Sequence, residues 1–313
     1  MRTEKMRILV SRSCRFAAAA AAGLLLSALP LAAQKAFDSP QQAADALVAA
    51  AAAGDNAALM AILGPEAKDL VASGDSVEDK NRLSKFAELA KQKLHVATDP
   101  KKPGTAVVEV GPEDWPLPIP LAQKDGKWRY DVKSGRKEIL ARRIGGNELD
   151  AINLLRGYVE AQLDYASEAR DGARRPEYAQ KFLSSDGKHD GLSWRNPDGT
   201  PGGPMGGEIA KALAAGYTDK TKPYNGYHFR VLTGQGPNAR LGERDYLFNG
   251  RMIGGFAALA WPANYGVTGI MTFQVNNDGV VYQKDLGPDT AKIVAGIQRF
   301  DPDKTWEVTH DEE

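Results

Sequence analysis

The stretch NELDAINLLRGYVEAQLDYA, residues 147–166, has the pattern of one long amphipathic helix. Its apolar residues recur every three or four positions, and charged residues occupy the other face. Asn147 is a residue type that commonly caps helices, so we expect the helix to begin there. A helix with an apolar stripe needs a partner surface that covers the stripe. The stripe consists of Leu149, Ile152, Leu155, Val159, Leu163 and Ala166.

Five strand-like segments follow this helix and predict an antiparallel sheet. Asn276-Asn277-Asp278-Gly279, between the last two, is typical of a tight hairpin turn. Short helices are expected at 208–215 and 288–297, whereas 186–207 is rich in Gly, Pro and Asp and has no periodicity. We therefore predict that residues 146–313 form one α+β domain, a long helix packed on a β-meander. The expected strands are 227–233, 245–248, 256–261, 268–275 and 280–284.

The residues before the long helix predict a smaller α+β domain at 34–145. From 37 to 93 the apolar residues have helical spacing, and Ser39-Pro40 and Gly54 are typical start and stop signals. Alternating apolar and polar residues then indicate antiparallel strands, with a tight turn at Asp125-Gly126. The expected strands are 105–110, 119–123 and 127–131.

The charged segment 133–146 contains three glycines, and we interpret it as a connector with the domain boundary near Gly145. Helices followed by antiparallel strands in both parts predict an α+β fold class for the chain.

The first 33 residues have the order of a secretory signal peptide. Basic residues come first, an apolar run covers 16–31, and Ala32-Ala33 form a small-residue exit. We expect cleavage after Ala33, a mature chain in the periplasm or outside the cell, and no stable membrane span after cleavage. A membrane anchor is the alternative interpretation. Cleavage would also remove Cys14, the one cysteine, so the mature chain would have no thiol ligand or nucleophile.

Composition and motifs exclude several function classes. The chain has 40 Lys+Arg and 40 Asp+Glu, which argues against a general nucleic-acid binder, since these need a basic excess. None of the four histidines stands three or four positions from another, so no helical metal pair is predicted. Neither Gly-x-Ser-x-Gly nor Gly-Lys-Ser/Thr occurs. We therefore nominate no catalytic residue, no metal ligand and no cofactor.

One acidic pair suggests a different chemistry. Glu113-Asp114 precedes Trp115, and an aromatic ring beside carboxylates is a common arrangement for binding sugars. Hydrolysis of a glycan would need a cleft that holds two carboxyls about 5–10 Å apart. A hydrolase of envelope polymers is therefore an alternative function, with an exposed loop as the simpler interpretation of these residues.

Long specific strings across the chain resemble an uncharacterised family of exported bacterial proteins, domain of unknown function 2950. The resemblance covers nearly the whole chain after residue 33, and it implies no established activity, cofactor or catalytic residue. The strings are WPLPIP at 115–120, RRIGGNEL at 142–149, YNGYHFR at 224–230, GGF at 254–256, WPANYGVTG at 261–269 and NDGVVYQKDLG at 277–287.

Two weaker resemblances concern architecture. The long helix, the Gly-Tyr-x-Phe strand at 226–229 and the Asp-Gly-Val hairpin at 278–280 are similar to the globular heads of type IV pilins and pseudopilins. The chain has no prepilin cleavage motif, so the resemblance implies a head fold and leaves pilus assembly open. The helices of 34–145 with Gly126-Lys127-Trp128 are similar to cone-shaped domains of the nuclear-transport-factor-like class.

Together these observations favour a non-enzymatic binding or interaction module of the bacterial envelope. Its partner would be an envelope protein or a glycan, and a pilin-like scaffold subunit is a further alternative. Aromatic residues on strands usually pack in a core, so the binding set and a core cluster are competing interpretations. The candidate binding residues are Tyr224, Tyr227, Arg230, Trp261 and Tyr265.

Overall fold

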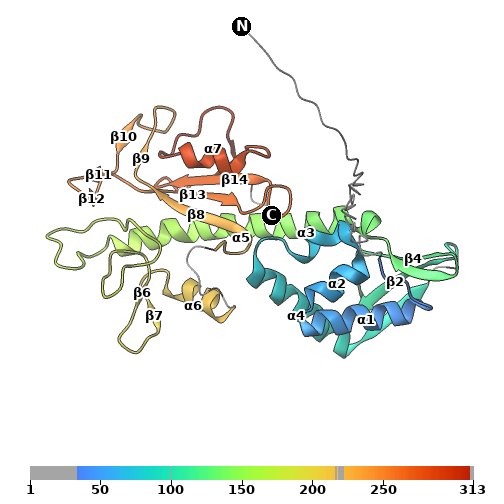
Figure 1. The fold of residues 1–313 in the computed structure, drawn as a ribbon. Helices are drawn as coiled ribbons and strands as arrows, with labels where there is room; N and C mark the ends of the chain where they lie inside the picture. The colour runs from blue at the N-terminus through green and yellow to red at the C-terminus, as the bar shows by residue number, and fades with distance from the viewer. Residues whose placement is uncertain (1–33, 99, 216, 218–221, 311–313) are drawn as a thin grey trace, which may run out of the picture. The chain divides into compact units, whose positions relative to one another are not determined.

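The computed structural model describes residues 34–98, 100–215, 217 and 222–310, all within one compact unit, Ala32–Glu313. Helices and antiparallel sheets alternate along it, which confirms the predicted α+β class (Figure 1). The predicted signal segment, residues 1–33, lies outside the described residues. Within them, no helix has both the length and the apolar character needed to cross a bilayer.

The N-terminal helices begin and end where the sequence predicts. The Ser39 side chain accepts a hydrogen bond from the amide of Gln42, and Gly54 ends the first helix with a φ of 62°. Asp55 caps the second helix through the amide of Ala58. These elements are α1 (Pro40–Ala53), α2 (Asn56–Leu63), the 3-10 turn η1 (Pro65–Ala67), α3 (Lys68–Val71) and α4 (Ser76–Gln92).

An antiparallel sheet with strand order β1-β2-β4-β5 follows, and β3 pairs with β2. Along β2 every second side chain is buried, as an amphipathic strand requires. The Tyr130 hydroxyl donates a hydrogen bond of 3.1 Å to the carbonyl of Ala43 and ties this sheet to α1. The strands are β1 (Leu94–Thr98), which the sequence analysis missed, β2 (Thr105–Val110), β3 (Trp115–Pro116), β4 (Leu121–Lys124) and β5 (Lys127–Tyr130).

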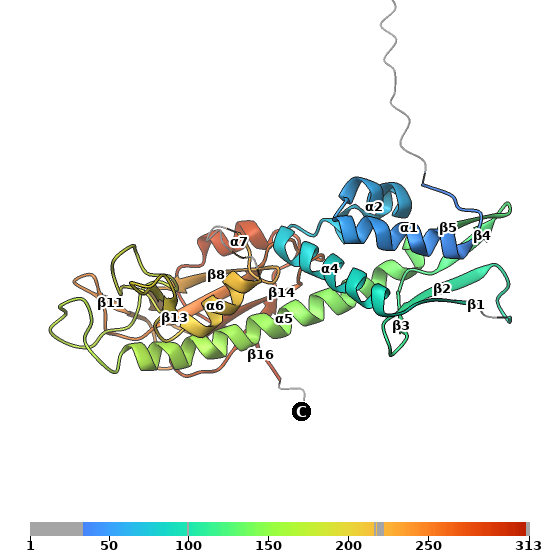
Figure 2. The same cartoon turned by 90° about the horizontal axis from the view of Figure 1, so that it is seen from below.

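Helix α5 (Val132–Tyr165) corrects the predicted connector. The charged segment 133–146 is helical, and Asn147 is buried inside the helix instead of capping it. Most residues of 133–144 are good helix formers, and buried contacts of Arg143 with α3 offset the cost of the glycines. Figures 1 and 2 show α5 passing from the N-terminal helices to the C-terminal sheet. The division into domains at 145 stays a prediction, although one hydrophobic cluster lies on each side of it.

The C-terminal sheet has the order β16-β15-β14-β13-β8, with every pair antiparallel, and contains four of the five strands predicted for the meander. The predicted strand at 245–248 lies outside it, because its residues pair in two small separate sheets. Helix α5 covers one face, where the Tyr158 hydroxyl donates to the carbonyl of Ala257, and α7 covers the other (Figure 1). The strands are β8 (Tyr227–Leu232), β13 (Ala257–Pro262), β14 (Met271–Asn276), β15 (Tyr282–Asp285) and β16 (Glu307–Val308), and α7 is Thr290–Gly296.

Short elements fill the connections of this half. They are β6 (Trp194–Arg195), β7 (Pro201–Gly202), α6 (Gly206–Ala214), β9 (Gly234–Gln235), β10 (Arg244–Asp245), β11 (Leu247–Phe248) and β12 (Arg251–Met252).

Two glycine substitutions test the continuity of α5 and the hairpin. Gly146 lies within the helix, and an added Cβ would meet no atom within 4 Å, so Gly146→Ala should stabilise the fold by about 1 kcal/mol. Gly279 has a φ of 79°, so Gly279→Val should destabilise it by roughly 1 kcal/mol or more. Urea unfolding measures both. A loss of stability in Gly146→Ala would show that α5 is interrupted there.

Candidate functional site

A cavity of about 700 Å³ lies beside the first residues of strand β8. Its walls come from α5, the segment 182–205, helix α6, residues 222–224 and β8 itself. Aromatic and aliphatic side chains form most of the lining. They are Leu154, Phe182, Leu183, Trp194, Pro201, Met205, Ile209, Ala212, Tyr217, Pro223, Tyr224, Tyr227 and Phe229.

The wall at 182–205 includes most of the stretch 186–207, which has no periodicity in the sequence. Two backbone hydrogen bonds show that this segment folds back on itself. The amide of Ser184 donates to the carbonyl of Ser193 at 2.7 Å, and the amide of Met205 donates to the carbonyl of Leu192 at 3.0 Å. Glycine is required at two of the closest approaches. An added Cβ would lie 2.7 Å from the backbone at Gly191 and 2.6 Å from the Leu192 carbonyl at Gly203. The glycines therefore let two backbone segments pack into a wall.

A partly exposed ion pair between Asp190 and Lys181 joins two parts of this wall. The Asp190 carboxylate accepts hydrogen bonds from the amide of Ser185 at 2.7 Å and from the Lys181 ammonium at 2.8 Å. Desolvation opposes ionisation, but these hydrogen bonds outweigh it and lower the pKa of Asp190 to about 2. At neutral pH the Asp190 carboxylate is therefore ionised and bound to Ser185 and Lys181 within the wall.

Charged side chains lie at the rim of the cavity. Asp186, Arg195, Glu208 and Lys222 all line it, and all four residues are exposed. His228 is half-buried, and desolvation lowers its pKa, so its imidazole is neutral at pH 7. Such a cavity suits an amphipathic ligand whose apolar part enters and whose polar part stays at the rim. No group of three or more His, Cys, Asp or Glu residues suited to a metal occurs in the described part of the chain.

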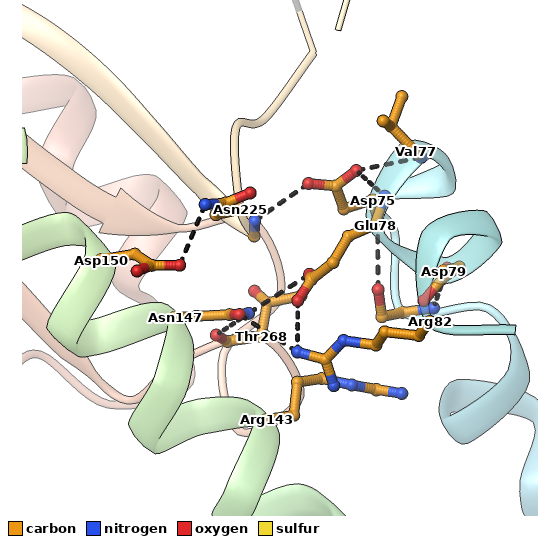
Figure 3. A network of polar contacts seen from close by, with 12 residues as sticks. Asp75, Val77, Glu78, Asp79, Arg82, Arg143, Asn147, Asp150, Asn225 and Thr268 are labelled. Atoms are coloured by element: carbon orange, nitrogen blue, oxygen red, sulfur yellow. Dashed lines mark hydrogen bonds and ion pairs between the residues drawn. The ribbon is translucent and has the colours of Figure 1, made fainter. Parts of the chain in front are cut away.

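A buried polar network, which we term the junction, adjoins the cavity (Figure 3). At its centre Asp75, 2% exposed, uses one carboxylate oxygen to cap α4 through the amides of Val77 and Glu78. Its other oxygen accepts from the Gly226 amide and from the Tyr217 hydroxyl, each at 3.0 Å. Since Tyr217 lines the cavity, one carboxylate joins α4, the turn before β8 and the cavity wall.

Helices α4 and α5 meet at the junction through charged and amide groups (Figure 3). Arg82 forms an ion pair with Glu78 and donates to the Asn147 side chain at 3.3 Å, and Asn147 donates to the Thr268 carbonyl at 3.0 Å. Desolvation raises the pKa of Glu78. Arg143 donates to the carbonyls of Asp69 and Leu70, at 2.8 and 2.7 Å. Burial lowers the pKa of Arg143.

Three of the strings quoted above for their family resemblance meet at this junction. Asn147 comes from 142–149, Gly226 from 224–230 and Thr268 from 261–269. Glu148 adds a further contact, since its carboxylate accepts from the amides of Ile270 and Met271 at 2.8 and 2.9 Å. These strings therefore hold the N-terminal helices on the C-terminal sheet.

The predicted binding set does not form one surface. Tyr224 and Tyr227 line the cavity, and Tyr227 is fully buried, with its hydroxyl donating to the Met271 carbonyl. The Arg230 guanidinium donates to the carbonyls of Val294 and Ile297 at the end of α7 and lies 5.3 Å from the Trp261 ring. Tyr265 lines a separate cavity of about 370 Å³. Because side chains alternate along a strand, Tyr227 points to one face of the sheet, whereas Arg230 and Trp261 lie together on the other.

Glu113 and Asp114, the acidic pair considered for hydrolysis, lie on the turn between β2 and β3. Asp114 forms an ion pair with Lys93 at 2.7 Å, and Glu113 accepts a hydrogen bond from the Trp115 indole at 3.0 Å. Neither residue lines the two cavities described here.

Sequence reasoning missed most of the cavity because its lining comes from segments far apart in the chain. Trp194, Ile209 and Tyr217 carry no motif, and only the fold brings them to Tyr224 and Phe229. The one available signal was the glycine-rich stretch 186–207, since such runs are common where two backbones approach closely.

Replacing Asp75 with alanine tests the junction. Asp75→Ala removes a helix cap, leaves the buried Gly226 amide without its acceptor and removes one of the two acceptors of the Tyr217 hydroxyl. We expect a loss of about 2–4 kcal/mol in the free energy of unfolding. Asp55→Ala is the matched control, because Asp55 only caps an exposed helix start and should cost about 1 kcal/mol. Equal losses in urea unfolding would contradict the central role of Asp75.

Comparisons with known proteins give a family without an assigned activity. The family described as "Protein of unknown function (DUF2950)" matches residues 34–309. No curated protein and no solved structure matches the chain. Since the match covers most of the sequence, the chain belongs to the DUF2950 family of proteins of unknown function.

Proposed function

We propose that this protein is a non-enzymatic binding module of the bacterial envelope, and that its ligand occupies the cavity beside β8. The observation that carries the proposal is the lining: apolar and aromatic side chains inside and four exposed charged residues at the rim. A volume of about 700 Å³ is within the range of small-molecule and side-chain sites.

The walls of the cavity support a preformed site. The segment 182–205 is held by backbone hydrogen bonds, and Tyr217 is fixed by hydrogen bonds with Asp75 and Asn225 at 3.0 and 3.1 Å. A preformed wall lowers the entropy lost when a ligand binds. The rim carries both signs of charge, so the ligand is recognised mainly by its apolar part.

A ligand screen with a cavity variant tests this function. Envelope glycans, peptidoglycan fragments, peptides and lipids are added to the purified protein, and a ligand at 100 times its Kd should stabilise it by about 2.7 kcal/mol. Ile209→Arg places a charged side chain in the cavity and should abolish the shift in melting temperature. Ile293→Arg on α7 is the matched control, because Ile293 is 41% exposed and lies outside the cavity. An equal shift in both variants would place binding elsewhere.

The envelope location is supported by the order of basic, apolar and small residues in 1–33. Expression of the full chain in a bacterial host should give exported protein that begins at Gln34. Intact-mass measurement of the periplasmic fraction checks this expectation. Retention of Met1 in exported material would contradict cleavage after Ala33.

A scaffold function is the second candidate. Its specific support is the packing of one long helix, α5, on an antiparallel sheet, the arrangement that the resemblance to pilin heads implies. Self-assembly of the purified mature protein, followed by sedimentation and electron microscopy, would favour the scaffold. The hydrolase alternative has no comparable support at Glu113 and Asp114, because both make contacts on an exposed turn.

A further inference from the structure

Strand β8 is an edge strand, and its edge opens beside the cavity. Among the strands of the described residues it pairs with β13 alone, at the end of the strand order β16-β15-β14-β13-β8. Both ends of β8 are buried, whereas the four residues between them, 228–231, are partly exposed. By contrast, β14 is buried along almost its whole length. The middle of β8 is therefore partly exposed, as are β15 and β16 at the opposite end of the sheet.

The register shows which backbone groups point away from β13. Tyr227 exchanges two hydrogen bonds with Tyr224, at 2.8 and 3.0 Å, and stands opposite Pro262, which has no N–H. The carbonyl of Gly226, one residue earlier, accepts instead from Ala263 on the β13 side. Because direction alternates along an antiparallel strand, Phe229 and Val231 direct their N–H and C=O groups outward, as Tyr227 does.

The outward groups of Phe229 and Val231 have no hydrogen-bond partner among the residues that the structure describes. The edge is occupied on both sides of them: Tyr224 pairs with Tyr227, and the Tyr246 amide donates to the Thr233 carbonyl at 2.9 Å. Two N–H and two C=O groups are thus left between two closed ends. An exposed strand edge of this kind is a template for another strand.

A polypeptide backbone matches this edge, because it supplies donors and acceptors at the spacing of a strand. Every second side chain of an added strand would point to the face of Tyr227 and Phe229, both of which line the cavity. A second copy of the chain fits this edge poorly. Pairing of β8 with the β8 of that copy would bring the copy's own segment 182–205 and helix α6 against the same opening. The open part is short, which suits a few residues of an extended segment.

We propose that the cavity ligand is an extended peptide segment of a partner protein, which adds a strand to the β8 edge and places a large apolar side chain in the cavity. This inference rests on the proposed binding function and names its ligand class. The strand hydrogen bonds would give affinity independent of sequence, and the cavity would select the side chain.

The experiment uses peptides selected from a random 12-residue phage-display library on the intact mature protein. Val231→Pro removes the outward N–H but keeps the β13 ladder, since proline is tolerated on an edge strand when its nitrogen faces away from the neighbour. We expect Val231→Pro to weaken a selected peptide at least 10-fold and the control Val231→Ala less than 3-fold. Melting temperatures of both variants verify folding.

A second measurement uses the unmodified protein. Selected peptides are N-methylated at one position at a time, and methylation at alternate positions should weaken binding at least 10-fold while the positions between remain neutral. Hydrogen exchange at the amides of Phe229 and Val231 should slow when peptide is bound. Peptides that bind with no alternation and no protection of these amides would overturn strand addition.

The outcomes separate this inference from the function on which it rests. If no peptide is selected but a glycan or lipid gives a thermal shift that Ile209→Arg abolishes, the peptide inference is wrong and the binding function stands. If β8 pairs with itself, sedimentation will show a dimer that Val231→Pro dissociates, and the peptide inference is again wrong. If no class of ligand shifts the melting temperature, both proposals fail.

Discussion

The buried carboxylate of Asp75 is the constraint on which the rest of the structure depends. A charge removed from water must be given hydrogen-bond donors, and here the donors come from separate parts of the chain. Two amides belong to the start of α4, one belongs to Gly226 in the turn before β8, and one hydroxyl belongs to Tyr217. The direction in which β8 enters the sheet is therefore set from the N-terminal helices, more than 140 residues earlier in the sequence.

Helix α5 connects this network to the hydrophobic cores of both halves of the chain. Its first turns contribute Val132 to the N-terminal core, and its later turns contribute Leu155 and Tyr158 to the C-terminal core. Between them, Arg143 and Asn147 make the polar contacts of the junction. Three of the six strings that resemble the family contribute to this junction, so these three account for architecture. The part of the cavity wall at 182–212 lies outside them, whereas Tyr224, Tyr227 and Phe229 of the string at 224–230 also line the cavity.

The proposed binding site combines the cavity with the open edge of β8, which lies beside it. A cavity alone would accept many apolar groups, and an edge alone would pair with many strands. Placed side by side, they would together select the ligand that we propose, an extended segment with a large side chain at one position. Hydrogen bonds within the chain hold the wall and the Asp75 network in place, which favours binding with little rearrangement.

The sequence by itself determined the helices from Pro40 to Gln92, most strands, the α+β class and the family, because caps, turns and periodicity are local properties. It failed at 133–146, where glycines and charges indicated a connector, because most of these residues favour a helix and tertiary contacts of Arg143 offset the cost of the glycines. It grouped Tyr227, Arg230 and Trp261 by type, although Tyr227 points to one face of the sheet and Arg230 points to the other, beside the Trp261 ring. Only the tertiary structure decided the cavity and the open edge, because both depend on contacts between residues distant in the chain, which no local pattern encodes.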